Sequence, residues 1–533
     1  MADNTNRVYL FDSTLRDGAQ TQGVDFSVAD KMAIARALDS IGIDYVEGGW
    51  PGANPTDDAF FRDAPKLKRA KFTAFGMTRR PGRSVENDPG LAALLNVEPA
   101  AVCMVGKTWD YHVDVALEIP RDENVKMISD SIAHAKAKAG EALFDAEHFF
   151  DGYKASPEYA LSCIKAAYEA GARWVVLCDT NGGTLPHEVD RIVREISKYV
   201  PGSHLGIHCH NDTENAVANS LAAVNAGARQ IQGTLNGLGE RCGNANLTAI
   251  IPTLMLKMGF DTGLNHDDLR QLTRVSRLLD ERLNRPPSRN AAYVGESAFA
   301  HKGGLHVSAV EKDPATYEHI DPAVVGNERH IVVSDQSGRS NILARFREFG
   351  FDIDPKHPKL PRLLEIVKER EFEGYAYDGA EASFEMLARR TLGEVPQFYD
   401  LHSFRVLDER RWNARGELVT VSEATVKVDV GKEQHMAVAE GNGPVNALDN
   451  SLGKVLLDSY PELGDMKLVD YKVRILTPTD GTGAITRVMI ESADGQDRRW
   501  SCIGLSTNII DASYNALQDS ITYKLFRDGA KPA

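Results

Sequence analysis

Cysteine is scarce in this chain, which has six cysteines in 533 residues. Their spacing forms neither a zinc-finger pattern nor the dense disulfide framework of small secreted domains. Reduced thiols are the economical interpretation, and they are typical of the cytoplasm. We therefore expect a cytoplasmic protein whose fold does not depend on disulfides.

Long apolar runs and a surplus of positive charge are also missing. No apolar run reaches about 18 residues, the length that a membrane-spanning helix requires. The start MADNTNRVYLFD lacks the basic and apolar segments of a signal peptide. The net charge is −15, whereas general binders of nucleic acid or anionic membranes usually carry a basic surplus. We expect no membrane and no nucleic-acid partner, although a local basic pocket could still bind an anionic substrate.

Short runs of β-branched and aromatic residues alternate with amphipathic stretches through the first half of the chain. VYLFDST, KFTAFGM and WVVLCDT are such runs, and VADKMAIARALDSIG repeats apolar residues at three- and four-residue steps. About eight strand–helix units occupy roughly the first 260 residues, which is the size of a (β/α)8 barrel. A doubly wound open sheet is the alternative, but no glycine-rich dinucleotide motif opens the first helix. The sequence therefore predicts an α/β fold with a TIM barrel over residues 1–275.

Ionisable and amide side chains directly follow the predicted strands. In barrels of this kind the catalytic groups gather where strands end and the next loops begin. Core packing alone would not require polar groups at these positions. They are Asp12, Arg16, Asp17, Glu47, Glu147, Asp179, Thr180, His208, His210, Asn211, Asp212, Asn236, Glu240, Arg241 and Asn244.

The segment HCH carries the most specific signal. Side chains two residues apart on a strand share a face, so His208 and His210 are expected to converge while Cys209 points away. Asp17 is the natural carboxylate ligand beside them, and the carbonyl oxygen of Asn244 could be a fourth ligand. Nitrogen and oxygen ligands of this kind suit Mn²⁺, Zn²⁺, Co²⁺ or Mg²⁺. The alternative is a pair of hydrogen-bonded structural histidines without a metal.

Three motifs carry a family resemblance. DSTLRDGAQ, HCHND and NGLGERCGNANL resemble the signatures of the metal-dependent synthase family that includes 2-isopropylmalate, homocitrate and citramalate synthases. Hydroxymethylglutaryl-CoA lyase and the biotin-dependent carboxyltransferases are more distant members. AFAHKGGLHVSAV, VGNERHIVVSDQSGRSNI and STNIIDASYNAL extend the similarity through the C-terminal half. Within the family, AEHFFDGYK is most similar to the long bacterial, pyruvate-using members.

The resemblance implies a transferase that condenses acetyl-CoA with pyruvate and water to form citramalate and CoA, on the pyruvate route to isoleucine. The metal would bind pyruvate and activate its carbonyl carbon, while Arg16 would stabilise negative charge on the keto oxygen. Asp17 would hold the metal, and Gly18 would let the backbone turn tightly. The alternatives are a synthase that takes a larger 2-oxo acid, a lyase, or a carboxyltransferase with Lys107 as a modified metal ligand.

Further roles are carried over from the family motif by motif. Gln20, Thr180 and Glu147 match positions that contact substrate, Arg16 is expected to contact it too, and Glu147 is also expected to be catalytic. A histidine and a tyrosine of the linker are expected to reach the partner subunit's barrel in a homodimer. These are His306 and Tyr317, with His301 as the rival histidine and an interface or surface aromatic as the other interpretation of Tyr317. The residues expected to limit the size of the keto acid, which core packing would also explain, are Met77, Met104 and Phe144.

The remainder of the chain is predicted to hold a linker region over 276–400 and a regulatory domain over 401–533. Strand-like runs lead twice into similar helical segments, PVNALDNSLGKVLLD and IIDASYNALQDSITYKL, which indicates a duplicated β-rich unit with one helix per copy. The resemblance implies that an end-product amino acid, isoleucine, inhibits there. Helix starts at 442–446 and 507–511 could bind its carboxylate, or their polar residues could only cap the helices. The alternative from another functional class is a sensor that binds a metal but does not catalyse a reaction.

Overall fold

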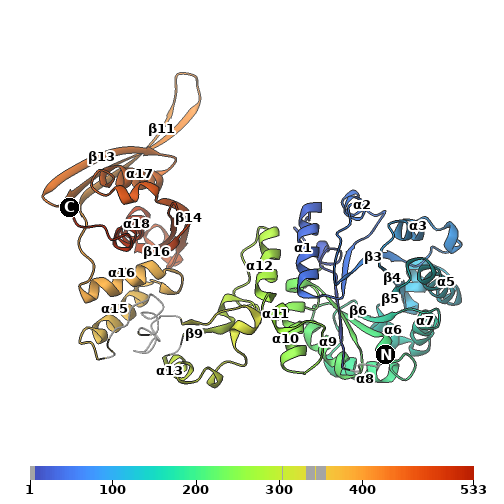
Figure 1. Cartoon of the computed structure of the whole chain (residues 1–533). Coiled ribbons are helices and arrows are strands. Elements are labelled where there is room, and N and C mark those ends of the chain that lie inside the picture. The colour runs from blue at the N-terminus through green and yellow to red at the C-terminus, as the bar shows by residue number, and fades with distance from the viewer. Residues whose placement is uncertain (1–5, 303, 332–342, 344–353, 355) are drawn as a thin grey trace. The chain divides into compact units, whose positions relative to one another are not determined.

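The computed structural model describes residues 6–302, 304–331, 343, 354 and 356–533. Its contacts divide the chain into two compact units, Met1–Phe299 with Ile320–Arg329, and Ala300–His319 with His330–Ala533. Figure 1 shows the first unit in blue to green and most of the second in orange to red. Residues 332–342, which carry part of one C-terminal motif, lie outside the described residues. The three-part division of the chain remains a prediction.

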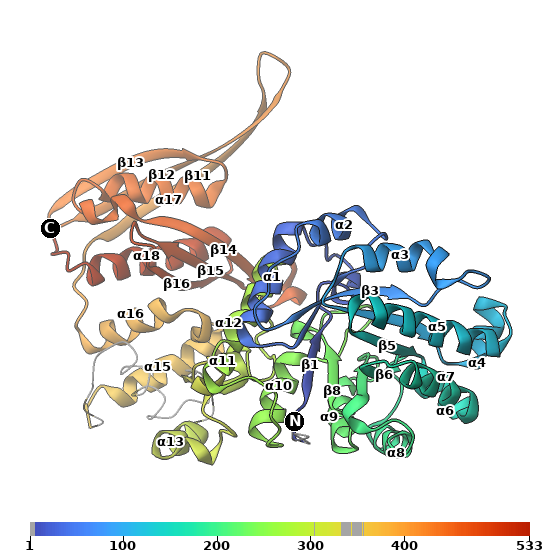
Figure 2. The same ribbon diagram turned by 45° about the vertical axis from the view of Figure 1, so that its right-hand side comes forward.

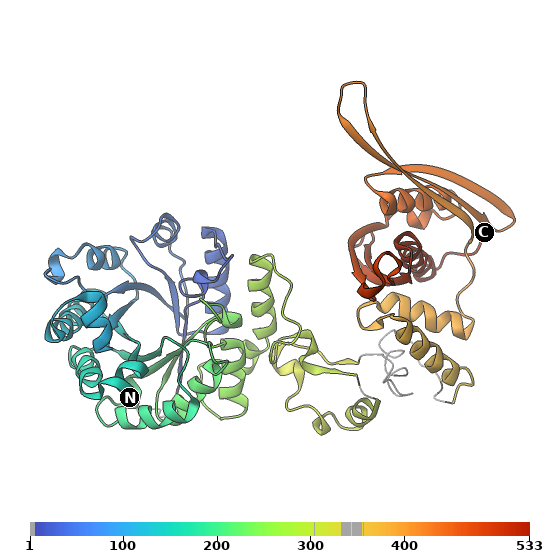
Figure 3. The same cartoon turned by 180° about the vertical axis from the view of Figure 1, so that it is seen from behind.

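The first unit is a closed parallel barrel in which each strand pairs with the next and β1 pairs with β8. Helices surround the strands, as the view from behind also shows (Figure 3). The predicted (β/α)8 barrel is confirmed. The strands are β1 (Tyr9–Asp12), β2 (Tyr45–Gly49), β3 (Lys71–Met77), β4 (Ala101–Lys107), β5 (Ala142–Glu147), β6 (Trp174–Asp179), β7 (Leu205–Cys209) and β8 (Gln230–Gly233).

Eight helices follow the barrel strands in turn, and shorter ones fill the loops and the end of the unit. The first set is α1 (Val28–Ile41), α2 (Pro55–Arg62), α3 (Pro89–Asn96), α5 (Arg121–Ala139), α7 (Pro157–Glu169), α8 (Pro186–Ile196), α9 (Ala216–Asn225) and α10 (Leu247–Leu256). The others are α4 (Asp110–His112), α6 (Phe149–Ala155), α11 (His266–Leu269) and α12 (Leu272–Arg282).

Local signals set the limits of α1. Ser27 accepts a hydrogen bond from the backbone N–H of Asp30, and the Asp30 side chain accepts one from the backbone of Ser27, which forms a capping box. Gly42 ends the helix in the left-handed region, with φ of 92°, a conformation that glycine adopts without strain. Ile34 and Leu38 lie one turn apart and are fully buried, which fixes the face of the helix that packs on the strands.

Strand alternation gives the barrel two apolar layers. Phe75, Cys103 and Leu143 occupy one row and belong to the cluster inside the barrel. Met104 and Phe144 occupy the adjacent row and pack between the strands and the helices. The prediction that Met104 and Phe144 face the substrate is therefore wrong, because each is one residue along its strand from a side chain that faces the lumen and so points to the opposite side.

The second unit begins with small elements and helices of the linker region. A two-stranded sheet of β9 (Ala300–His301) and β10 (His330–Ile331) accompanies α13 (Gly304–Lys312). Two longer helices, α15 (Leu360–Glu373) and α16 (Glu381–Leu392), follow. Leu363 of α15 and Phe384 of α16 are fully buried in one shared cluster. The predicted helical linker is confirmed.

Two copies of a β-β-β-α unit complete the second unit. The first has β11 (Asp400–Trp412), β12 (Leu418–Val430), β13 (Glu433–Gly441) and α17 (Pro444–Leu456). The second has β14 (Lys467–Ile475), β15 (Thr486–Ala493), β16 (Arg499–Ser506) and α18 (Ile509–Arg527). Both sheets are antiparallel, and Figure 2 shows α17 lying along the β11–β13 sheet.

The two copies match in side-chain detail. Asn450 of α17 donates to the carbonyl of Glu440, and Asn515 of α18 donates to the carbonyl of Leu505. In both copies the asparagine therefore ties the helix to the preceding strand, ten residues earlier in the chain. The predicted duplication is confirmed. None of the described helices is long and apolar enough to cross a membrane.

Candidate active site

The candidate site lies at the carboxyl ends of the barrel strands, where β1 and β7 bring three metal-ligand side chains together. Asp17 Oδ2 lies 3.3 Å from His208 Nε2 and 3.8 Å from His210 Nε2. Their ligand atoms all fall within 4.8 Å of one another, and all three residues are buried. Cys209 packs into the layer behind the strands. The structure thus gathers the three principal predicted ligands and leaves the cysteine outside the cluster.

Asn244 lies beside this cluster, because it forms an isolated antiparallel bridge with His210. Its Nδ2 donates to the carbonyl of Leu238, whereas its Oδ1 is buried and has no hydrogen-bond partner in the part of the chain that the structure describes. Buried amide oxygens are normally satisfied. A free carbonyl oxygen next to two imidazoles and a carboxylate fits a metal that prefers mixed nitrogen and oxygen ligands.

The charges around the cluster also fit a divalent cation. Asp17, Glu47 and Asp145 are all buried, and all three raise the pKa of Arg16 against the opposing effect of its burial. Burial raises the pKa of both Glu47 and Asp145, with Arg16 as an opposing influence. The cluster therefore places three buried carboxyl groups against one guanidinium, and a bound divalent cation would favour their ionised form.

The two histidines have different partners on their second ring nitrogens. His208 Nδ1 lies 2.9 Å from Gln232 Oε1, and His210 Nδ1 lies 2.9 Å from Arg241 Nη2. Burial and the neighbouring His208 lower the pKa of His210 to about 4. Burial would also lower the pKa of His208, but the hydrogen bond and charge of Asp17 outweigh it and raise the value. His210 is thus neutral near pH 7, which is the form that binds metals.

Arg16 is held from three sides. Its Nε donates to Glu47 Oε2 at 2.8 Å, and its Nη1 lies 3.3 Å from Asp17 Oδ2. The guanidinium carbon lies 3.8 Å from the centre of the Phe75 ring, in cation–π contact. Glu47 is fixed in turn by the hydroxyl of Ser13. Arg16 therefore has a set position beside the metal-ligand cluster before any substrate arrives.

Gly18 serves the turn after β1 in a way the sequence did not indicate. It begins a short 3-10 turn, Gly18–Gln20, outside the left-handed region. A Cβ at this position would lie 3.3 Å from Leu238 Cβ. Close packing against the loop after β8, rather than an unusual backbone angle, explains the glycine.

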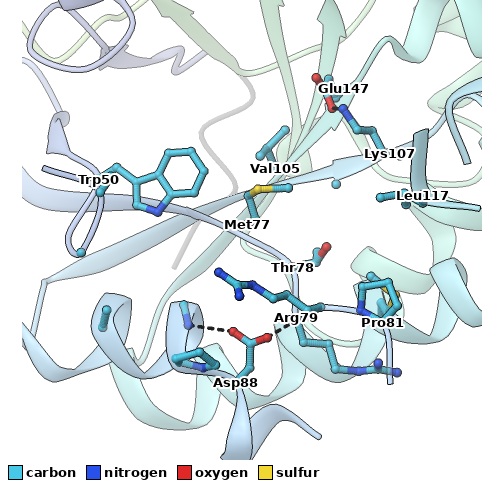
Figure 4. A pocket seen from close by; sticks show the side chains of 18 of the residues that line it. Trp50, Met77, Thr78, Arg79, Pro81, Asp88, Val105, Lys107, Leu117 and Glu147 are labelled. Atoms are coloured by element: carbon cyan, nitrogen blue, oxygen red, sulfur yellow. Dashed lines mark hydrogen bonds and ion pairs between the residues drawn. The ribbon is translucent and has the colours of Figure 1, made fainter. Parts of the chain in front are cut away.

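Three of the predicted substrate residues, Arg16, Gln20 and Glu147, line two cavities that share Trp50. One, of about 500 Å³, is lined by Trp50, Met77, Val105, Lys107 and Glu147 among others (Figure 4). Glu147 Oε2 lies 2.5 Å from Lys107 Nζ in that cavity. The second cavity, of about 470 Å³, is lined by residues that include Arg16, Gln20 and Trp50.

Thr180 connects two loops of the rim. Its hydroxyl accepts a hydrogen bond from the backbone N–H of His148, the residue after Glu147. Its carbonyl accepts one from Arg241, which also pairs with Asp212. Thr180 thus fixes the backbone next to Glu147.

Other rim residues make contacts that stabilise their loops. Asp179 accepts from the hydroxyl of Thr184, and Asn236 accepts from Ser276. Asn211 accepts from the backbone N–H at the start of α9. Asp12 accepts from both the backbone and the hydroxyl of Thr14, and burial raises its pKa to about 7.

The linker residues lie in the second unit. The rings of His306 and Tyr317 are 4.3 Å apart, and both side chains are exposed. The rival histidine, His301, instead lies 3.0 Å from Glu318 Oε1 and is mostly buried. His306 and Tyr317 thus form an exposed pair, whereas His301 is engaged within its own unit.

Several contributors to the site were not anticipated from the sequence. Phe75 stacks on Arg16, and Val105 lies in the same lumen-facing row as Met77 and Asp145. Gln232 contacts His208. Asp145 offered one available signal, because a carboxylate inside an apolar strand marks the face that points into the lumen.

Comparison with known proteins agrees with this geometry. A family model described as HMGL-like matches residues 7–275, one described as homocitrate synthase post-HMGL domain-like matches 293–370, and one described as LeuA allosteric (dimerisation) domain matches 378–525. The chain is 52% identical to the (R)-citramalate synthase of Aquifex aeolicus over 525 residues, which cover 98% of both chains. It is also 52% identical to that of Geobacter sulfurreducens over 522 residues, again 98% of both chains.

A 2-isopropylmalate synthase of Pseudoalteromonas atlantica is more distant, at 33% identity over 531 residues, which cover 96% of this chain and 95% of the relative. The similarity to the (R)-citramalate synthases is both stronger and complete along the chain. With its HMGL-like barrel and a domain that matches the LeuA allosteric (dimerisation) model, the chain belongs to the (R)-citramalate synthase family.

Proposed function

We propose that the protein condenses acetyl-CoA with pyruvate and water to form (R)-citramalate and CoA. The observation that carries the proposal is the convergence of Asp17, His208 and His210 beside Arg16 at the mouth of the barrel. Similarity over 98% of the chain to (R)-citramalate synthases supports the choice of pyruvate. The proposed cofactor is a divalent ion, one of Mn²⁺, Zn²⁺, Co²⁺ or Mg²⁺.

A metal bound by Asp17, His208, His210 and Asn244 would polarise the carbonyl of pyruvate as a Lewis acid. In the reaction, a proton leaves the methyl group of acetyl-CoA and a carbon–carbon bond forms to the keto carbon. The keto oxygen takes up negative charge and then a proton, which yields a hydroxyl group. Water finally cleaves the thioester and releases CoA, which makes the sequence effectively irreversible.

Arg16 stabilises the negative charge that develops on the keto oxygen. Its contacts with Glu47 and Phe75 hold the guanidinium in place, so little reorganisation accompanies the reaction. Glu147 and Gln20 line the two cavities that meet at Trp50. We assign Arg16, Gln20, Thr180 and Glu147 to substrate binding, with Arg16 and Glu147 also taking part in catalysis.

Two further proposals concern the rest of the chain. His306 and Tyr317 act in proton transfer at the barrel of the partner subunit in a homodimer, which their exposure and mutual contact support. Isoleucine inhibits through the domain that matches the LeuA allosteric domain. Its binding site is proposed near residues 442–446 and 507–511, between the two β-β-β-α copies, where Asp511 could pair with the ammonium group.

The test is a panel of 2-oxo acids with acetyl-CoA, in which free CoA is followed with a thiol reagent and the product is identified by chiral chromatography. We expect pyruvate to give the highest kcat/KM, and each added methylene to cost about 10- to 200-fold in a pocket that excludes it. Higher kcat/KM with 3-methyl-2-oxobutanoate would refute the choice of pyruvate. CoA release without a 2-oxo acid would indicate simple hydrolysis.

A further inference from the structure

A buried row of polar side chains runs across the barrel lumen behind His208. His208 Nδ1 lies 2.9 Å from Gln232 Oε1, and Gln232 Nε2 donates to Asp145 Oδ1 at 2.9 Å. The exposed fractions of His208, Gln232 and Asp145 are 5%, 0% and 3%. The three residues come from β7, β8 and β5, so the row links strands on different sides of the barrel. The proposed reaction uses neither Gln232 nor Asp145 directly.

The chemistry of the row gives it a direction. A carboxylate only accepts hydrogen bonds, so the amide NH₂ of Gln232 must face Asp145 and its oxygen must face His208. His208 must then carry its proton on Nδ1. A neutral imidazole with the proton on Nδ1 has its lone pair on Nε2, the atom that lies 3.3 Å from Asp17.

The other histidine of the cluster has no comparable arrangement. His210 Nδ1 faces the Arg241 guanidinium, which only donates hydrogen bonds. That contact favours the tautomer with the proton on Nε2, so metal binding at His210 Nε2 would require the proton to move to Nδ1 and Arg241 to give up this contact. The contrast makes His208 the imidazole whose Nδ1 proton is already held by the protein, so that Nε2 is the nitrogen left for a metal.

We propose that Gln232 and Asp145 are positioning residues that fix the tautomer and ring orientation of His208 for metal binding. The proposal rests on the metal site of the proposed function. Partners of this kind behind a metal-bound histidine change metal affinity by about 10- to 100-fold. A loss of this size should follow removal of the amide, with no change in the three direct ligands.

Gln230 provides a matched control. It is fully buried on the same strand, two residues before Gln232. Neither polar atom of its side chain has a hydrogen-bond partner among the described residues. Gln230→Met and Gln232→Met therefore make the same change in volume and polarity inside the same barrel, and only the second breaks the row.

The experiment uses the full-length chain, stripped of metal with a chelator and then titrated with Co²⁺ in competition with a chromophoric chelator. The visible absorption of bound Co²⁺ is recorded as a second readout of ligand geometry, and near-ultraviolet circular dichroism checks the fold. We expect Gln232→Met to weaken Co²⁺ binding about 10- to 100-fold and to alter the Co²⁺ spectrum. Gln230→Met should change neither.

Two further variants keep the test decisive if Gln232→Met does not fold. Gln232→Glu retains an acceptor for His208 Nδ1 and should bind Co²⁺ more tightly than Gln232→Met. Asp145→Asn retains an oxygen that accepts from Gln232, but it no longer fixes which way round the Gln232 amide lies. A smaller loss of Co²⁺ affinity is therefore expected than for Gln232→Met. Co²⁺ affinities of the Gln232 and Asp145 variants within about threefold of the unmodified chain would overturn the proposal. Failure of the unmodified chain to bind Co²⁺ would instead overturn the metal site itself.

Discussion

Replacing Arg16 by lysine tests the proposed stabilisation of charge. The guanidinium reaches Glu47 at 2.8 Å and Asp17 at 3.3 Å, while its central carbon lies 3.8 Å from the centre of the Phe75 ring. A lysine keeps the charge but has no planar fork, so it cannot keep these contacts and still direct a donor at the keto oxygen. Loss of one such donor costs about 2.7–4 kcal/mol, or about 10²- to 10³-fold in kcat.

The assay is steady-state CoA release with pyruvate varied at saturating acetyl-CoA. Because the metal is proposed to provide most of the binding of the keto acid, we expect KM for pyruvate to stay within about threefold while kcat falls far more. Titration of the Arg16→Lys chain with Co²⁺ is the control that the ligand cluster is intact. An unchanged kcat, or a loss confined to KM, would remove Arg16 from the transition state.

Four further predictions concern the metal, the dimer, regulation and pH. Chelation of divalent ions, or His208→Ala, should abolish CoA release with little change in circular dichroism, and full activity in a verified metal-free sample would contradict the mechanism. Mixing Glu147→Ala chains with His306→Ala chains should restore about one quarter of the unmodified activity. Half of the dimers are then hybrids, and each hybrid has one complete site out of two. If subunit exchange is verified and no activity returns, His306 acts within its own chain. In the intact chain isoleucine is expected to change substrate affinity by about 5- to 150-fold. Removal of residues 401–533 should abolish this inhibition while some CoA release remains. If an active truncated dimer is still inhibited, the effector site lies outside residues 401–533. Burial raises the pKa of Asp12 to about 7, so the folded state holds a proton that the unfolded state releases above about pH 4. Stability should therefore fall as pH rises from about 4 to 7, and Asp12→Asn should flatten the dependence of the unfolding temperature on pH; an unchanged slope would refute this.

The barrel could be predicted because its signals are local. Each strand is a short apolar run and each helix has its own periodicity, so the sequence indicates all the barrel strands without long-range information. The spacing of His208 and His210 by two residues predicts that they share a face, and the structure brings both to Asp17. That these residues bind a metal remains a prediction.

The direction in which side chains point could not be predicted for β4 and β5. Both faces of a barrel strand are buried, since one meets the lumen and the other meets the helices, so apolar residues occur in both phases. Met104 and Phe144 are apolar, as are their inward-facing neighbours, and nothing in the apolar pattern separates the two rows. Asp145 breaks the pattern, and its inward position places Phe144 outside the lumen.

Contacts across the lumen were beyond sequence reasoning for a different reason. Gln232 and Asp145 are 87 residues apart and lie on strands that are not neighbours in the barrel. Their contact depends on the curvature of the closed sheet and on side-chain length, neither of which is a local property of the chain. The stacking of Phe75 on Arg16 has the same origin, since the two residues come from β3 and from the loop after β1.

The pairing of Lys107 with Glu147 bears on the carboxyltransferase alternative. In that chemistry the lysine carries a carboxyl group and becomes an anionic metal ligand. Here Lys107 Nζ lies 2.5 Å from Glu147 Oε2, in the cavity that also contains Met77 and Val105. An added carboxylate would stand directly against Glu147 and repel it. The Asp17, His208 and His210 cluster, with Asn244 beside it, offers metal ligands without Lys107, so the geometry favours an unmodified lysine that pairs with Glu147.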